Sequence, residues 1–146
     1  QGSPRWEPYG ATLERAPFPV AYNGDIFGVD DLNALLDAYP ATRHVMLGRG
    51  IVANPALARM IRGGNPATLG ELAHFHDRLF CEYEALMGAD NAAARMKEWW
   101  SYAKCCFADP VSVHLAVRGV RGQAEYMAAV ERVFGTEALA DEPRLR

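Results

Sequence analysis

Apolar residues follow two patterns along the chain, short runs in the first part and helical spacing in the second. Val20 to Tyr22 and Val45 to Leu47 are nearly continuous apolar runs, the pattern of parallel strands buried on both faces. Between them, Asp30 to Tyr39 carries leucines at three- and four-residue steps, which predicts a helix. A second helix is predicted from Asn54-Pro55, as N-cap and first helical residue, to Arg62. This order of strand, helix, strand, helix predicts parallel strands with right-handed crossovers.

The breaker cluster Gly63 to Pro66 is the predicted domain boundary. Beyond it, apolar residues recur at three- and four-residue steps, which is typical of helices. The expected helices carry Leu72 to Met87, Asn91 to Phe107, Asp109-Pro110 to Val117 and Gly122 to Phe134, and the end from Leu139 is expected to be a frayed tail. We therefore expect an α/β part over residues 1–64 and an all-α part over residues 65–146.

Each predicted strand is followed by a turn that contains glycine, Asn23-Gly24-Asp25 after the first and Gly48-Arg49-Gly50 after the second. Glycine lets the backbone approach an anion closely, and N–H groups at the start of the next helix can donate to it. Arg49 adds a permanent charge with a fork of donors that matches phosphate oxygens. Either turn alone is a weak signal, and Asn23-Gly24-Asp25 is also typical of a tight turn with an Asx bond. The pair, one βα unit apart, favours a phosphate site.

These segments resemble a known family. Tyr22 to Ile26, Val45 to Gly50 and Asn54-Pro55 resemble the C-terminal end of the tRNA-dihydrouridine synthases, flavoenzymes that reduce the C5–C6 double bond of uridines in tRNA. Arg95 to Trp100 and Tyr126 to Val130 resemble helices of the family's helical tail. The resemblance covers nearly the whole chain. It implies the last two βα units of a TIM (β/α)8 barrel, strands seven and eight, followed by a C-terminal helical bundle that binds tRNA.

The resemblance also implies a cofactor and its site. FMN would be bound through its phosphate at Asn23, Gly24, Asp25, Gly48 and Arg49, and NADPH would be the reductant of the complete enzyme. The family's catalytic cysteine, and the lysine and histidine residues that hold flavin and base, would lie on earlier strands. We therefore assign no catalytic residue in this chain and expect it to be inactive alone. Its barrel strands, with open edges, are expected to self-associate.

The charge distribution points to a local RNA-binding patch rather than a surface that binds nucleic acid everywhere. The net charge is −3, yet the segment from Arg95 to Arg121 holds five basic residues against two carboxylates. The candidate contacts with tRNA phosphates are Arg95, Lys97, Lys104 and Arg118. The apolar stripe Met96, Trp99 and Trp100 could stack bases, but its helical spacing favours packing in the core.

Cysteine, histidine and hydropathy patterns exclude other classes of protein. Cys81, Cys105 and Cys106 have neither metal nor disulfide-framework spacing, so reduced thiols and a cytoplasmic location are expected. The four histidines lack ligand companions, so no metal is expected. No apolar run approaches a membrane span of about 20 residues. Since the chain begins Gln1-Gly2-Ser3-Pro4, we expect it to be a piece of something longer.

Two alternatives stay open at this stage. One is a stand-alone helical RNA- or protein-binding module with a small α/β appendage and no cofactor. The other is a different flavin barrel with the same phosphate loops and an unrelated helical tail. Flavin bound to the full-length protein would exclude the first alternative, and tRNA binding would exclude the second.

Overall fold

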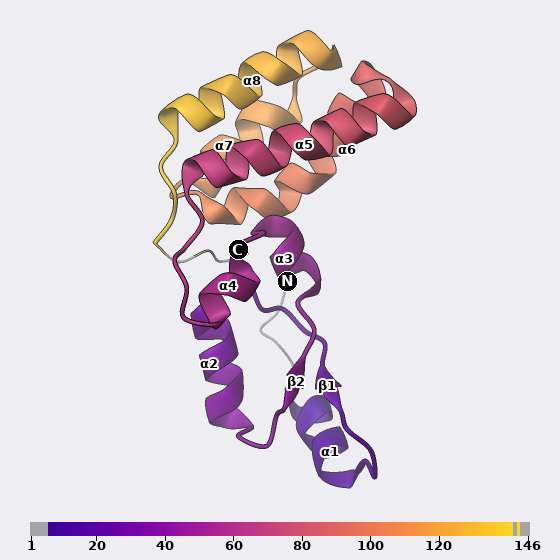
Figure 1. Ribbon diagram of the computed structural model, residues 1–146, viewed down its shortest axis with the longest axis vertical. Helices are drawn as coiled ribbons and strands as arrows, with labels where there is room; N and C mark the ends of the chain where they lie inside the picture. Colours follow the sequence, from indigo (N-terminus) through magenta and orange to yellow (C-terminus); the bar gives the residue numbers. More distant parts are fainter. Residues whose placement is uncertain (1–5, 142, 144–146) are drawn as a thin grey trace.

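The computed structural model describes residues 6–141 and residue 143 and is mostly helical, with one small parallel sheet. The sheet pairs β1 (Ala21–Tyr22) with β2 (His44–Val45). The helices are α1 (Glu7–Arg15), α2 (Val29–Ala38), α3 (Gly48–Ala53), α4 (Leu57–Ile61), α5 (Leu69–Met87), α6 (Ala89–Ala103), α7 (Pro110–Arg118) and α8 (Gly122–Thr136), with a 3₁₀ turn η1 (Lys104–Cys106) after α6. Figure 1 shows α5 to α8 gathered at one end, and α1, α2 and the two strands at the other.

The two strands are covered on one face. Ala21 pairs with His44 and Tyr22 with Val45, and the N–H of Met46 extends the ladder by donating to the Tyr22 carbonyl at 2.8 Å. Tyr22 and Val45 share the face that packs into a small apolar cluster with side chains from α1 and α2. Ala21, His44 and Met46 are exposed, Met46 by 56%. A parallel strand pair with one bare face is what a piece of a larger α/β sheet would leave.

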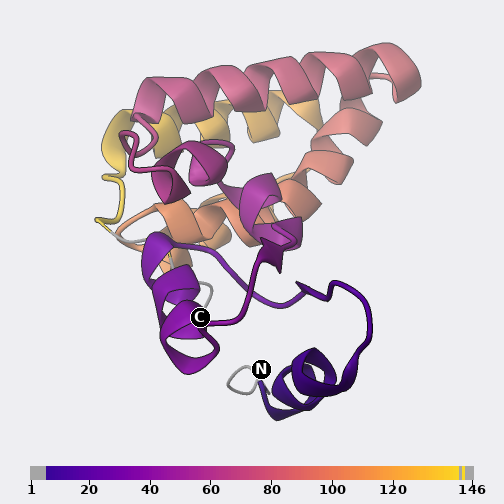
Figure 2. The same cartoon turned by 60° about the horizontal axis from the view of Figure 1, so that its bottom comes forward.

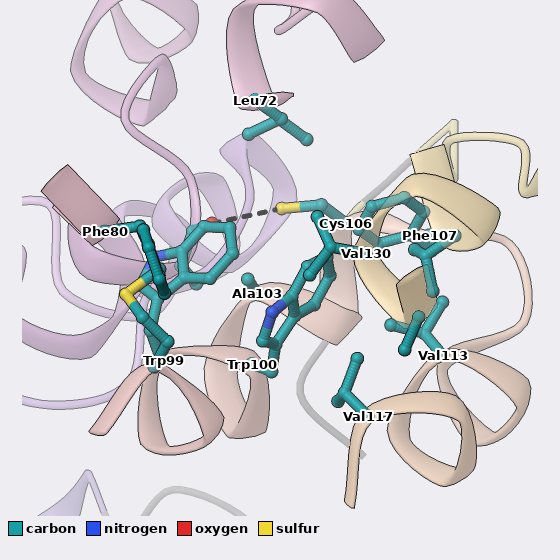
Figure 3. Close-up of a cluster of buried hydrophobic side chains, with 14 of the residues drawn as sticks. Leu72, Phe80, Trp99, Trp100, Ala103, Cys106, Phe107, Val113, Val117 and Val130 are labelled. Atoms are coloured by element: carbon teal, nitrogen blue, oxygen red, sulfur yellow. Dashed lines mark hydrogen bonds between the residues drawn. The ribbon is translucent and has the colours of Figure 1, made fainter. Parts of the chain in front are cut away.

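The helices from α5 onward enclose a core of their own. Its centre is a set of aromatic and apolar side chains from α5, α6, α7 and α8, drawn in Figure 3. The largest fully buried side chains in it include Trp100, Tyr126 and Met96. The indole Nε1 of Trp100 donates to the Tyr126 hydroxyl at 2.9 Å, so the polar atom of each ring is satisfied inside the core.

Helix α3 joins the two regions. Ala53 is fully buried and belongs to the helical core, and the neighbouring carbonyl of Val52 accepts a hydrogen bond from Nε1 of Trp99 at 2.9 Å. The turned view in Figure 2 shows α1 and α2 projecting away from the layer of helices that α3 contacts.

The segment after the second strand corrects our prediction. Gly48-Arg49-Gly50 was expected to be a turn, but it is the first turn of α3. A Cβ at Gly50 would lie 1.9 Å from the carbonyl oxygen of Ile26, so the close approach of α3 to the backbone at Ile26 requires glycine there. Asn54 does not start a helix. It ends α3, and its Oδ1 accepts from the N–H of Ala56 in the turn that leads to α4.

Other boundaries also differ. Each strand is only two residues long, because the described chain supplies no further strand to extend the ladder. The second strand begins one residue earlier than predicted. Helix α6 ends at Ala103, before the expected Phe107. Residues 138–140 are not frayed: the N–H groups of Ala108 and Ala140 donate across to Ala138 and Cys106. Residues 142 and 144–146 of the expected tail lie outside the described residues.

Candidate functional site

The structure brings the two glycine-containing segments together. Because β1 and β2 are parallel neighbours, their carboxyl ends meet at one edge of the sheet, with Asn23-Gly24-Asp25 after β1 and the start of α3 after β2. The guanidinium of Arg49 forms an ion pair with the carboxylate of Asp25 across this edge. Both side chains are close to half-exposed, so the pair lies at the surface and can meet a ligand.

A cavity of about 470 Å³ opens at this edge, between the two segments and α1. This volume lies within the range of small-molecule sites. Its lining residues are Pro8, Tyr9, Thr12, Val20, Tyr22, Asn23, Gly24, Asp25 and Arg49. Four of the five residues that the sequence singled out for phosphate binding therefore line one cavity, and Gly48 precedes Arg49 at its rim.

The two glycines differ in what requires them. A Cβ at Gly24 would lie 2.1 Å from the Tyr22 hydroxyl, so a side chain there would require the ring of Tyr22 to move. A Cβ at Gly48 would meet nothing within 4 Å among the described residues. Space at Gly48 is thus open to an approaching group. The first N–H groups of α3, which a helix cannot satisfy internally, begin at the same residue.

The residues of this edge fit a phosphate group. One donor of Arg49 is taken by Asp25, which leaves others in its fork for a ligand. The Asp25 carboxylate has the same sign of charge as a phosphate, so this residue fits as the partner that holds Arg49 and as a backbone donor. It does not fit as a side-chain ligand.

Sequence reasoning missed the aromatic support beneath the first segment. Nε1 of Trp6 donates to the Tyr22 hydroxyl at 3.1 Å, and the ring of Tyr9 meets that of Tyr22 edge-on at 5.1 Å. Burial raises the pKa of Tyr22, so its hydroxyl stays protonated. The available signal was Tyr22 itself, an aromatic residue directly before Asn23-Gly24.

Three of the four candidate RNA contacts lie on one side of the helical region. Lys97 and Lys104 are seven residues apart, two turns along the same face of α6 and η1. Lys104 and Arg118 both lie close enough to His114 for their charges, together with burial as the larger cause, to lower its pKa. Lys97 is half-buried and its ammonium donates to the carbonyl of Val120, in the connection between α7 and α8.

Arg95 lies on another side of α6. It lies two positions before Lys97, which places the two side chains on nearly opposite faces of the helix. Its guanidinium pairs with Glu98 at 2.5 Å, beside a small cavity that Tyr83 and Tyr102 also line. The structure therefore does not group Arg95 with Lys97, Lys104 and Arg118.

The aromatic stripe of α6 is core, as predicted. Met96, Trp99 and Trp100 are all buried, so none offers an open face to a base. Among the described residues no three His, Cys, Asp or Glu side chains gather as a metal site. None of the described helices is long and apolar enough to cross a membrane.

Comparison with known proteins gives the family. Residues 2–85 match the family described as Dihydrouridine synthase (Dus), more than half of the chain. The chain belongs to this family. The resemblance drawn from Tyr22 to Ile26 and from Val45 to Gly50 is thereby confirmed.

Curated relatives of the chain extend the match into the helical region. A protein of Ralstonia nicotianae named tRNA-dihydrouridine(16) synthase is 30% identical over 138 residues, covering 88% of this chain and 41% of the relative. Proteins of the same name from Neisseria meningitidis serogroup B and Cupriavidus necator are 31% and 28% identical, and cover 90% and 89% of the chain. The chain spans about two fifths of the length of these relatives.

Proposed function

We propose that this chain is the C-terminal portion of a flavin-dependent tRNA-dihydrouridine synthase that reduces uridine to 5,6-dihydrouridine in tRNA, with NADPH as reductant. Residues 1–64 would supply strands seven and eight of a (β/α)8 barrel, and residues 65–146 a helical tRNA-binding domain. Support comes from the family match, from relatives more than twice as long, and from a parallel strand pair with one bare face. The relatives' names make uridine 16 the proposed target.

The observation that carries the proposal is the Arg49–Asp25 pair, which joins two glycine-containing segments at the carboxyl ends of adjacent parallel strands. In (β/α)8 barrels the loops after strands seven and eight are a frequent phosphate site. Asn23, Gly24, Asp25, Gly48 and Arg49 would hold the FMN phosphate there. Arg49 would donate from the guanidinium N–H groups that Asp25 does not occupy, and backbone N–H groups would donate at Gly48 and around Gly24.

The chain's part in the reaction is to bind and orient. Bound FMN would supply the hydride for the uracil ring, and the proton donor would lie upstream of this chain. Lys97, Lys104 and Arg118 would contact the tRNA backbone from one side of the helical domain, and Arg95 from another face of α6. The Lys97 ammonium already donates to Val120, so it would both brace the α7–α8 connection and present charge at its edge.

The flavin half of the proposal is tested in the full-length protein by replacing Arg49 with alanine. Loss of a charge-assisted hydrogen bond should weaken FMN retention by roughly ten- to a hundredfold. Arg43→Ala is the matched control, because Arg43 lies before β2, at the opposite end of the same strand, and bonds only to local carbonyls among the described residues. Equal FMN affinity in wild type and Arg49→Ala would count against the site.

The RNA half is tested with a Lys97→Ala, Lys104→Ala double variant. Each lost phosphate contact should lower tRNA affinity for all sequences alike and reduce the salt slope by about one. Arg132→Ala, which removes an exposed charge from α8, is the control. A full-length protein that binds tRNA but neither releases FMN on denaturation nor forms dihydrouridine would support the stand-alone RNA-binding module instead.

A further inference from the structure

The side chain of Arg59 forms hydrogen bonds with the connection between α4 and α5. Nε of Arg59 donates to the carbonyl of Asn65 at 2.9 Å, and Nη2 to that of Pro66 at 3.2 Å. The same guanidinium forms a two-pronged bond with the carboxylate of Glu71, at 2.7 and 2.9 Å. Arg59 belongs to α4 and Glu71 to α5, so one fork holds both helices and the backbone between them.

Glu71 also fixes where α5 begins. Its carboxylate accepts from the N–H of Thr68 at 2.8 Å, and the Thr68 hydroxyl accepts from the N–H of Glu71 at 3.2 Å. This reciprocal pair is a capping box, which sets the start and entry direction of a helix. The hydrogen bond from Arg59 is the main cause that lowers the pKa of Glu71 to about 2, so the fork meets an ionised carboxylate at neutral pH.

The backbone at this connection is shaped to fit Arg59. A Cβ at Gly64 would lie 2.6 Å from Cγ of Arg59, so the chain passes directly over the arginine stem. Gly63, at φ 81°, adopts the left-handed conformation that glycine favours and turns the chain toward this contact. A segment with two glycines would otherwise be a natural hinge. Here the side chain of Arg59 bonds to carbonyls of this segment and packs against Gly64.

Arg59 is also connected to the candidate phosphate site. From Arg49 the chain continues through α3 to Asn54, whose side chain accepts from Ala56 and donates to the sulfur of Met60 in α4. Two carbonyls of α3 also accept hydrogen bonds, one from Nε1 of Trp99 and one from the thiol of Cys106, which Figure 3 draws as the dashed line. Few freely rotating residues therefore lie between Arg49 and the start of α5.

We propose that Arg59 is a positioning residue that locks the helical bundle at a fixed angle to the phosphate-binding edge. A tRNA held by the bundle then presents its target uridine at one place relative to the flavin. This inference rests on the proposed function. Releasing the lock leaves the cofactor site intact and misplaces the substrate.

The test uses the full-length flavoenzyme with three variants. Arg59→Ala removes the fork, Arg59→Lys keeps the charge without the fork, and Glu71→Gln keeps an acceptor for Thr68 without the ion pair. We expect Arg59→Ala to lower kcat/KM for tRNA by about tenfold or more, with Arg59→Lys close to it and Glu71→Gln intermediate. FMN retention should equal that of wild type, and amide exchange of residues 63–68 should rise. Arg59 and Arg78 both line a cavity of about 460 Å³ between α4 and α5, so Arg78→Ala, which removes the same charge nearby, is the control.

The outcomes separate this inference from the proposed function. If wild type forms no dihydrouridine, the proposed function fails, while exchange at residues 63–68 still tests the lock. Unchanged exchange in Arg59→Ala would overturn the lock. Faster exchange with unchanged kcat/KM would overturn its positioning role, and an equal loss in Arg78→Ala would assign the effect to charge alone. If Arg59→Ala does not fold, a wild-type kcat/KM in Arg59→Lys overturns the inference in the same way.

Discussion

The two regions of the chain differ in how completely they bury their apolar surface. From α5 to α8, side chains from four helices meet in one core, and its large members such as Trp100 and Tyr126 are fully buried. Around the strands, Tyr22 and Val45 pack beneath α1 and α2, whereas Met46 on the other face is 56% exposed. The helical region buries its largest side chains in one core, to which Ala53 of α3 also contributes, whereas one face of the strand pair stays exposed.

This difference fits a division of labour. A self-contained helical bundle can offer a stable surface to a large, charged substrate. In the proposed barrel, a strand pair with one bare face would gain its partners from the other strands, and its carboxyl ends would join the other loops of the active site. Substitutions in the two regions should therefore differ in their effect on stability.

Trp100→Ala should unfold much of the helical region. It removes a fully buried ring and leaves the hydroxyl of Tyr126 without its indole donor, a loss of about 3–5 kcal/mol in the free energy of unfolding. Met46→Ala, on the bare face, should change the free energy of unfolding by less than about 0.5 kcal/mol in this chain alone. Chemical denaturation followed by circular dichroism measures both. Similar losses in the two variants would mean that the strand face is covered after all.

The elements that could be predicted from the sequence follow the same division between the two regions. Helical spacing predicted α5, α7 and α8 within a few residues, because Leu72, Phe80 and Tyr126 face one continuous core. The prediction of a turn at Gly48-Arg49-Gly50 was wrong, because composition cannot distinguish a glycine in a turn from one that lets a helix approach Ile26. The ladder of residues 138–140 against 106–108 was also invisible, since it depends on a contact more than thirty residues away along the chain.

At the candidate site, the residue types were predictable and the geometry was not. The composition of Asn23-Gly24-Asp25 and Gly48-Arg49 predicts a phosphate site, and that site stays a prediction. The pairing of Arg49 with Asp25, and the support of Gly24 by Tyr22, depend on which strands lie side by side. The lock made by Arg59 gave no local signal, because two of its four hydrogen bonds go to backbone carbonyls and the other two to Glu71, twelve residues along the chain.

Gly50→Ala should be the next most damaging change. Its Cβ would lie 1.9 Å from the Ile26 carbonyl and 2.8 Å from Cδ2 of Leu57, which forces α3 away at a cost of about 1–3 kcal/mol. Gly48→Ala, two residues earlier in the same helix, meets nothing and should be neutral or slightly stabilising. Thermal unfolding compares the pair. Equal melting temperatures would show that the α3 contact is not needed.

Acid should weaken the helical region in two separate ranges of pH. Burial is the main cause that lowers the pKa of His76, whose Nε2 accepts from the Tyr126 hydroxyl at 2.6 Å and whose Nδ1–H donates to Asp77. The unfolded chain takes up this proton near pH 6.5, so stability falls as pH drops below that value. Glu71, with its pKa lowered to about 2, adds a further loss as pH falls below 4.5. Denaturation midpoints across pH should show both, and His76→Gln should remove only the upper one.

The bare strand face is tested most directly by amide hydrogen exchange on this chain alone, with light scattering on the same sample. We expect strong protection in α5, α6 and α8. At Val20 to Tyr22 and His44 to Met46 we expect fast exchange, or protection that accompanies self-association of the chain. In the full-length protein the same strand amides should be protected in the monomer. A strictly monomeric chain whose strand amides are strongly protected would contradict the account, because those strands would then have found their partners within these 146 residues.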